Sequence, residues 1–191
     1  NINPNNTNAH IKLVNIFMLA EDHARAEEEL KSLIELHPEN KDYHFHLGNI
    51  FYQKNQFQQA LDYYLKAFDL GFVENDILLK IAECYYEIKD FDSTRIFISK
   101  VLTTSPREAK AFLISGDIDF DNYRITEAIE KYQNAFSLDE GKRNLGVANL
   151  SSYLQTKIEV LKDKLKFDEL NENLLIALGY CSYEINNFFE L

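Results

Sequence analysis

The sequence repeats itself with a period of about 34 residues. Its three prolines are Pro4, Pro38 and Pro106, so the first two lie one period apart and the last two lie two periods apart. Periods of about 20 to 50 residues are typical of chains that stack one small structural unit on the next. A chain of 191 residues can hold one large domain or several such units, and the period favours the repeated units.

A shift by one period aligns side chains of similar size. Some columns are aromatic or large and apolar, and others are small, so that neighbouring backbones can approach each other while large side chains fill the space beside them. The columns hold Phe17, Phe51 and Tyr85; Leu30, Tyr64, Ile98 and Tyr132; Gly48, Ala82 and Gly116; Ala26, Ala60, Thr94 and Ala128; and Leu33, Ala67, Val101 and Ala135.

Each unit carries two apolar stripes at helical spacing. In the second unit, residues 42–54 and 57–70 each place apolar side chains three or four residues apart, and the polar stretch "KNQ" joins them. Pro38 and Pro106 follow the second stripe of a unit, where proline stops a helix from continuing. The six glycines and three prolines leave little for hairpins. The sequence therefore predicts an all-α chain of helix pairs.

A known repeat pattern is carried by Leu47, Gly48, Phe51, Ala60, Tyr64, Ala67 and by Pro38 or Pro106. With these residues the sequence resembles the tetratricopeptide repeat (TPR) family. The resemblance implies helix-turn-helix repeats stacked into a right-handed superhelical α-α solenoid. Four repeats are expected over residues 7–40, 41–74, 75–108 and 109–142. The position of the bulky first-helix aromatic of the family, often Trp, holds His10, His44, Leu78 and Phe112, so the match rests on the overall pattern.

The regular period ends after the fourth repeat. Gly146 follows Gly116 by clearly less than one period, and Gly179 follows Gly146 by nearly one period. We expect residues 143–171 to form an irregular fifth helix pair and residues 172–191 to form the first helix of a truncated sixth repeat. Residues 1–6 are expected to end a preceding repeat or to be a linker, so the chain is expected to be a fragment of a longer solenoid. The basic stretch 162–166 is expected on a solvated helix face, with a basic contact patch as the alternative.

The resemblance also implies where a ligand binds, because in this family the first helices line a concave groove. The matching positions combine aromatic and aliphatic side chains with carboxylates and, near the N-terminus, amides. Aromatic rings supply contact area, amides pair with a peptide backbone, and carboxylates attract Lys or Arg. We therefore expect an apolar or basic peptide or helix of a protein partner. The expected groove residues are Asn15, Phe45, Asn49, Tyr52, Leu79, Glu83, Tyr86, Glu87, Leu113, Asp117, Phe120 and Asp121, and Ile176, Tyr180 and Tyr183 would extend them.

Other interpretations of these residues stay open. The carboxylates could serve only solubility, and the aromatic side chains could be half-buried between repeats. The carboxylate-clamp subfamily, which grips the acidic C-termini of chaperones, needs Lys and Arg in the groove, but the sequence offers Ile11 and Leu79 there, with Lys80 and Lys110 nearby.

The stretch "GDIDFDNY" at residues 116–123 places aspartates on alternate positions, as a calcium-binding loop does. Such a loop needs Gly at its sixth position and Glu at its twelfth, where this chain has Asn122 and Ala128. On a helix, Asp117 and Asp121 share one face and Asp119 points elsewhere, so no metal site is expected. Asp119 stands in an otherwise aromatic column, where a buried carboxylate costs several kcal/mol unless it is paired.

Composition excludes several function classes. The 20 basic and 31 acidic side chains give a formal net charge of −11, which repels phosphate backbones and anionic lipid and argues against nucleic-acid and membrane partners. No apolar run reaches the roughly 18 residues of a membrane span, and no signal peptide is visible. Low cysteine usage then favours the cytoplasm. Cys84 and Cys181 are expected to be ordinary buried thiols.

Neither catalysis nor a cofactor is expected. The five histidines lack a Cys or Ser nucleophile partner in the sequence, and there is no Gly-rich phosphate loop. The sequence therefore predicts a non-catalytic protein–protein interaction module within a larger scaffold or adaptor. One alternative is a structural module that self-associates into a homo-oligomer, and another is the recruiting arm of a larger enzyme.

Overall fold

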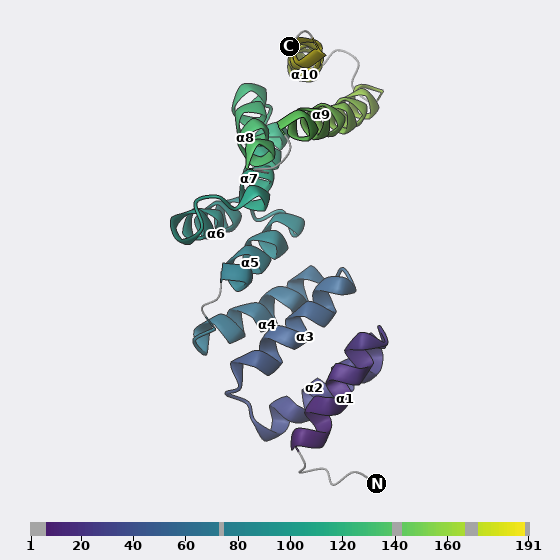
Figure 1. The fold of residues 1–191 in the computed structure, drawn as a ribbon, viewed down its shortest axis with the longest axis vertical. Coiled ribbons are helices and arrows are strands. Elements are labelled where there is room, and N and C mark those ends of the chain that lie inside the picture. The colour runs from purple at the N-terminus through teal and green to yellow at the C-terminus, as the bar shows by residue number, and fades with distance from the viewer. Residues whose placement is uncertain (1–6, 73–74, 139–142, 167–171, 190–191) are drawn as a thin grey trace. The chain divides into compact units, whose positions relative to one another are not determined.

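The computed structural model describes residues 7–72, 75–138, 143–166 and 172–189 (Figure 1). Over these ranges it is all helix and turn, which confirms the predicted all-α class. The chain divides into two compact units, Asn1–Thr104 and Ser105–Leu191. The right-handed superhelical stacking implied by the family resemblance stays a prediction.

The first unit holds three helix pairs. They are α1 (Thr7–Leu19) with α2 (His23–Leu36), α3 (Lys41–Gln53) with α4 (Phe57–Asp69), and α5 (Asn75–Glu87) with α6 (Phe91–Thr104). Within the unit α2 also packs on α3, and α4 packs on α5. The second unit begins with a fourth pair, α7 (Ala109–Asp121) and α8 (Ile125–Ser137). The first helices of the four pairs begin at residues 7, 41, 75 and 109, where the four repeats were expected to begin.

The turn inside each pair has the same backbone conformation. The residues with positive φ other than glycine, among those described, are Glu21, Asn55, Lys89 and Tyr123, and each lies one period after the one before it. A left-handed residue reverses the chain sharply enough for the second helix to fold back on the first. Only Asn55 is of a type that readily adopts this conformation, so the turn is imposed by helix packing more than by local preference.

Packing within each pair depends on matched side-chain sizes. A Cβ atom added to Gly48 would lie 2.6 Å from Cδ1 of Tyr64, whose ring is fully buried on α4. Gly116 lies under Tyr132 in the same way. In the two other pairs the corresponding buried residues are Val14 with Leu30 and Ala82 with Ile98. Each glycine is matched by a tyrosine, and the larger Val14 and Ala82 are matched by aliphatic side chains, which agrees with the expected close approach of backbones at Gly48.

The second unit differs from the sequence prediction after α8. Residues 143–165, expected to belong to an irregular helix pair, form the single 23-residue helix α9 (Arg143–Leu165). The physical reason is an unbroken apolar stripe along α9, whose buried residues are Leu150, Leu154, Ile158 and Leu161. The prediction of a turn inside this segment was wrong.

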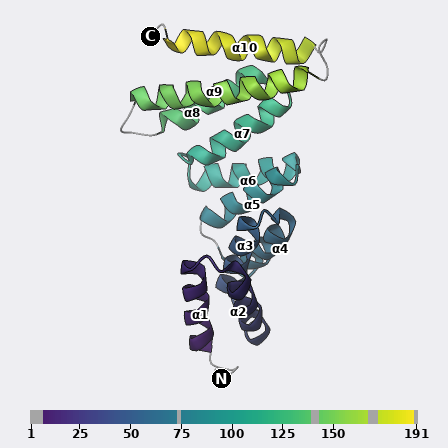
Figure 2. The same ribbon diagram turned by 90° about the vertical axis from the view of Figure 1, so that its right-hand side faces the viewer.

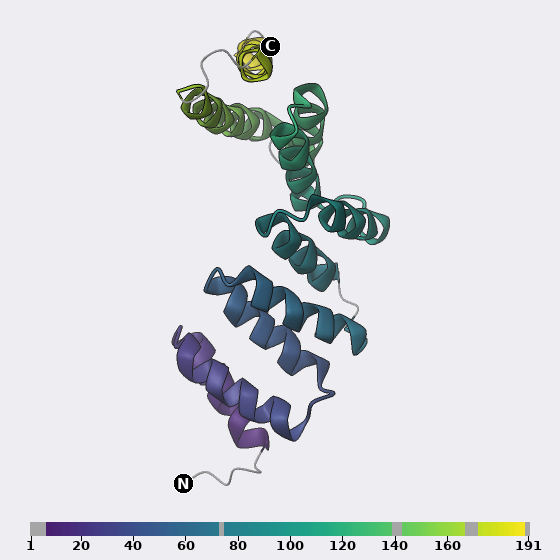
Figure 3. The same ribbon diagram turned by 180° about the vertical axis from the view of Figure 1, so that it is seen from behind.

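The last helix, α10 (Glu172–Phe189), packs along α9 and also reaches α8. Figure 2 shows α9 and α10 side by side along their length, and Figures 1 and 3 view α10 nearly end on. Ala177 and Cys181 of α10 are buried in the core that α7, α8 and α9 share. At the end of α9, Lys162 and Lys166 are exposed and pair with acidic side chains of their own helix.

Candidate peptide-binding surface

Side chains of α3 and α5, the first helices of the second and third pairs, contact each other. Burial raises the pKa of the Tyr52 hydroxyl on α3, and the neighbouring Glu83 carboxylate on α5 raises it further. Nζ of Lys80 lies 4.4 Å from the centre of the Tyr52 ring and 3.5 Å from Oε2 of Glu83. The three side chains therefore form a small network that holds Tyr52 in place.

Glu83 is less accessible than the sequence analysis expects. Its residue surface is only 4% exposed, whereas a carboxylate that recruits a basic ligand has to reach solvent. The sequence prediction of Glu83 as a ligand-facing charge needs correction, because its carboxylate is buried and pairs with Lys80.

The amide and aromatic side chains of α3 are also organised by the neighbouring helix. Oδ1 of Asn49 accepts a hydrogen bond of 2.8 Å from the Tyr64 hydroxyl on α4. The Phe45 ring stacks on Phe72 with centroids 4.5 Å apart and lies 5.7 Å from the Tyr64 ring. Phe45 and Asn49 are half-buried, so each presents one edge to solvent while the other edge is fixed by packing.

The remaining expected residues of this unit are more open. Asn15 on α1 and Glu87 on α5 are exposed, and Leu79 and Tyr86 on α5 are half-buried. The Tyr86 ring lies 6.0 Å from that of Phe91. The first unit therefore leaves seven of the predicted groove residues at least partly accessible: Asn15, Phe45, Asn49, Tyr52, Leu79, Tyr86 and Glu87.

In the second unit α9 covers what was expected to be acidic groove. Asp117 accepts hydrogen bonds from the hydroxyls of Tyr132 (2.7 Å) and Tyr153 (2.8 Å), and Nζ of Lys157 lies 2.5 Å from its Oδ1 atom. Asp121, one helical turn later, faces Lys164 at 3.9 Å. These lysines come from α9, whose single long helix the sequence did not predict.

Phe120 is also misplaced by the sequence prediction. It is 2% exposed and belongs to the core of the second unit, with half-buried Leu113 packed against that core. The expected aromatic strip therefore does not continue through Phe120, because α9 brings Lys157 within 5.2 Å of the ring centre. The signal that sequence reasoning missed is the pair Tyr153 and Lys157, four residues apart on one face of α9.

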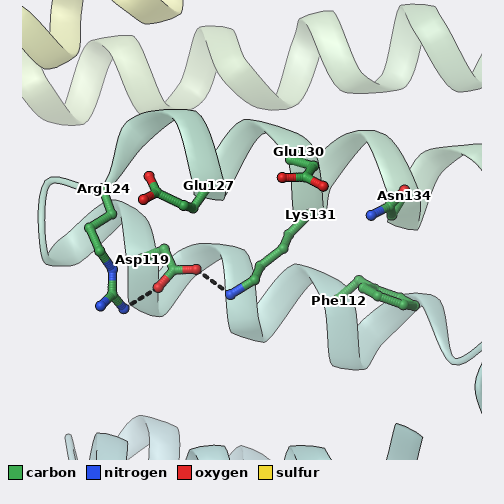
Figure 4. Close-up of a pocket in the computed structure, with 7 residues that line it drawn as sticks. All are labelled: Phe112, Asp119, Arg124, Glu127, Glu130, Lys131 and Asn134. Atoms are coloured by element: carbon green, nitrogen blue, oxygen red, sulfur yellow. Dashed lines mark hydrogen bonds and ion pairs between the residues drawn. The ribbon is translucent and has the colours of Figure 1, made fainter.

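Asp119 is buried and paired, which accounts for a carboxylate in an aromatic column. It forms ion pairs with Arg124 and Lys131, and Figure 4 shows these cations approaching it from two sides. One and two periods earlier, the positions of Asp119 and Lys131 hold aromatic pairs. Phe51 stacks on Tyr63 at 5.4 Å, and Tyr85 lies 5.6 Å from Phe97. The fourth repeat therefore substitutes an ion pair for a ring pair.

The structure assigns ordinary structural roles to the other chemically active residues. Asp117, Asp119 and Asp121 each face different cations, and among the described residues no group of His, Cys, Asp or Glu side chains is arranged to hold a metal ion. Burial raises the pKa of the Cys84 thiol to about 12, so it stays protonated and a poor nucleophile. Nε2 of His44 donates to the carbonyl oxygen of Pro38 at 2.8 Å. No helix in the described part of the chain has the length and apolar character needed to span a membrane.

Comparisons with known proteins agree with the helix-pair architecture. A family model described as tetratricopeptide repeat matches residues 11–71. Intraflagellar transport protein 70A of Danio rerio is 26% identical over 104 residues, which are 54% of this chain and 16% of that protein. The chain therefore spans about one sixth of the length of this relative.

Solved structures match over more of the chain. A crystal structure of MamA is 23% identical and covers 73% of this chain and 82% of its own, with a TM-score of 0.66. MamA 41-end from Desulfovibrio magneticus RS-1 has a TM-score of 0.72 at 14% identity, covering 98% and 95% of the two chains. YrrB, described as a TPR protein with an unusual peptide-binding site, has a TM-score of 0.62 at 16% identity, covering 88% and 89%. The chain therefore has the helix-pair fold of these structures, and its residues 11–71 match the tetratricopeptide repeat family.

Proposed function

We propose that this chain is a non-catalytic interaction module that binds an apolar and basic peptide or helix of a partner protein, within a larger scaffold or adaptor. The binding surface is the set of seven accessible residues on α1, α3 and α5. Tetratricopeptide repeat proteins generally mediate protein–protein interactions. The peptide-binding site that the description of YrrB mentions is a property of that protein, and here it supports only the class of ligand.

The observation that carries the proposal is the way Tyr52 is held. Its ring is partly exposed, yet one face is covered by Lys80 at 4.4 Å and the ring packs against Phe57 at 5.5 Å. A side chain that is already ordered loses little conformational entropy when it binds, and aromatic anchors of this kind contribute most to binding energy. Tyr86 and Leu79 on α5 continue the apolar surface, while exposed Glu87 gives a basic ligand its counter-charge.

The second unit is left out of the proposed surface. Asp117 and Asp121 are neutralised by lysines of their own chain, and Phe120 is buried. An ion pair with a ligand would have to displace Lys157 and two tyrosine hydroxyls from Asp117. The formal net charge of −11 still favours a basic partner over an acidic one.

The test is a peptide array in which apolar and charged positions vary independently, probed with the whole chain. Peptides that combine apolar and basic residues are expected to be retained, and Tyr86→Ala and Glu87→Lys are each expected to weaken the retained peptides about tenfold, or about 1.4 kcal/mol. Glu35→Lys on α2, exposed and with the same charge change, is the control. Preference for acidic peptides, or equal binding by all variants, would rule the proposal out, and sedimentation at several concentrations would then test self-association.

A further inference from the structure

The fourth helix pair presents a charged face where the two preceding pairs present aromatic rings. In the second and third pairs each helix contributes one ring to this face, and in the third pair the rings are Tyr85 and Phe97. In the fourth pair Asp119 and Lys131 occupy the same positions and form an ion pair. The fourth pair therefore lacks the apolar area that its predecessors have at these positions.

The rings of the second and third pairs are contacted by the pair before them. Nζ of Lys31 on α2 lies 5.9 Å from the centre of the Phe51 ring on α3. The Phe68 ring on α4 lies 6.4 Å from that of Phe97 on α6. In stacked repeats, the surface that neighbours bury together is what makes them unfold together. The three pairs of the first unit are therefore expected to unfold as one.

The charged face of the fourth pair is satisfied within that pair. Arg124 and Lys131 both pair with Asp119, which is 3% exposed. The other residues that line the pocket on this face are exposed or half-buried: Phe112, Glu127, Glu130 and Asn134 (Figure 4). A face of paired and exposed charges needs no apolar cover, which is also the property of the polar outer face of a capping repeat.

The second unit also has a core of its own. The members of this core come from α7, α8, α9 and α10, and among them Tyr132, Leu154 and Ala177 are fully buried. All of them lie within Ser105–Leu191. Apolar burial inside the second unit is thus available to stabilise it without a contribution from α1–α6.

We propose that the charged face of α7 and α8 begins a separate cooperative folding unit, so that the first and second units unfold independently of each other. A ligand bound to the first unit then stabilises α1–α6 and leaves the unfolding of α7–α10 unchanged. The proposal requires no particular ligand, so it stands or falls separately from the proposed function.

The test measures native-state hydrogen exchange of the whole chain by mass spectrometry, because the slowest amides of a folding unit exchange when that unit unfolds. Ile81 on α5 is fully buried, and along the chain its pair stands between the second and the fourth pair. Ile81→Ala is expected to speed exchange of the slowest amides of α3 and α4 at least tenfold, and that of α7 and α8 less than twofold. Ile81→Val removes one methyl group and should show the same asymmetry with smaller factors.

Ile118→Ala on α7 is the reciprocal variant, since Ile118 is 1% exposed. It is expected to speed exchange in α8 and α9 at least tenfold and to leave α5 and α6 within twofold of wild type. Ile96→Ala on α6 is the matched control, because Ile96 is 57% exposed and its loss should leave both units unchanged.

Two results would overturn the proposal. Similar acceleration in both units from either buried variant would show that the whole chain unfolds as one. Acceleration by Ile81→Ala confined to α5 and α6 would show that each helix pair unfolds alone, so that the charged face marks no special boundary.

Discussion

Lys157 on α9 holds its Nζ atom 2.5 Å from Oδ1 of Asp117 on α7. The hydroxyls of Tyr132 and Tyr153 donate to the same carboxylate, and the Lys157 ammonium also lies 5.2 Å from the centre of the Tyr153 ring. Both charged side chains are largely shielded from solvent. Asp117 therefore connects α7 to α8 and α9, and its charge stabilises the fold of the second unit.

The first prediction concerns the ion pair of Lys157 and Asp117. Lys157→Met keeps the length of the side chain but leaves the Asp117 carboxylate without its cation, so the free energy of unfolding should fall by about 1–3 kcal/mol. Asp117→Asn should cost a similar amount, and the double variant should cost less than the sum, because the two side chains interact directly. Urea unfolding monitored by circular dichroism measures all three.

Lys162→Met provides the matched control for that comparison. Lys162 is exposed on the same helix and pairs with exposed Glu159 at 2.9 Å, and such surface pairs contribute about 0–1 kcal/mol. If Lys162→Met destabilised the chain as much as Lys157→Met, the buried Lys157–Asp117 pair would contribute no more to stability than an exposed pair.

The second prediction concerns the contact between Gly48 and Tyr64. Gly48→Ala favours the helix by up to about 1 kcal/mol, but its Cβ atom would lie 2.6 Å from a buried ring and overpacking costs about 1–3 kcal/mol. We expect net destabilisation. Adding Tyr64→Ile should recover part of it, because Ala82 and Ile98 are the corresponding pair in the third repeat. A thermal unfolding series of the two single variants and the double variant measures the recovery.

Gly179→Ala is the control for this series, since its Cβ atom meets nothing within 4 Å. It should leave stability unchanged or raise it by up to about 1 kcal/mol. The same substitution should thus have opposite effects in α3 and α10. Destabilisation of both helices to the same degree would argue against steric overlap with Tyr64 as the cause.

The sequence predicts what depends on comparing one repeat with the next. The helix starts, the short turns and the alternation of small and large side chains follow from residues that occupy the same column in each repeat, whereas the contact of Tyr64 with Gly48 is seen only in the structure. It fails where the outcome depends on what a neighbouring helix supplies. Glu83 is buried beside Lys80 and Tyr52, which stands on another helix, and Phe120 is buried in a core that includes α9. Comparing each residue with its counterparts in the other repeats does not predict either contact.

The error in α9 has a different origin. The spacing of Gly146 from Gly116 and Gly179 predicts a helix pair over residues 143–171. The buried residues Leu150 and Leu154, and those that follow them on the same face, keep a helical spacing through the expected turn. An uninterrupted apolar stripe therefore outweighed an irregular glycine spacing in deciding where the helix ends.

The third prediction concerns the buried ion pair of the fourth repeat. Lys131→Phe alone would place a ring beside the buried Asp119 carboxylate and should cost about 1–3 kcal/mol. Asp119→Tyr with Lys131→Phe recreates the ring pair of Tyr85 and Phe97. Since replacing a buried ion pair by well-packed apolar side chains is often neutral or stabilising, the double variant should be within about 1 kcal/mol of wild type.

Denaturant unfolding of the single and double variants tests this compensation, and their salt dependence provides a second readout. The wild-type chain should lose some stability as salt screens the Asp119 pairs, whereas the double variant should lose less. Arg124, which is about half exposed, can return to water when Asp119 is replaced. Additive losses in the double variant would show that the two positions do not substitute for an aromatic pair.

The fourth prediction concerns pH and the link between α2 and α3. Glu27 accepts from Nζ of Lys31 at 2.6 Å and from Nζ of Lys54, just after α3, at 2.5 Å. Burial alone would raise the pKa of Glu27, but these two hydrogen bonds outweigh it and hold the pKa below its ordinary value of 4.5. The folded chain thus binds this proton more weakly than the unfolded chain does. The stabilisation is present above that ordinary value and is lost as pH falls through the lowered pKa.

Glu27→Gln should therefore lower the free energy of unfolding at pH 7, by at most about 1 kcal/mol for a partly exposed group. The difference from wild type should shrink towards zero as pH falls through the lowered pKa of Glu27, because Glu27 is then protonated in both states. Urea unfolding at a series of pH values measures this difference, and Glu28→Gln on exposed α2 surface controls for the loss of one negative charge. A difference that stayed constant or grew on acidification would mean that Glu27 does not link the two helices through its charge.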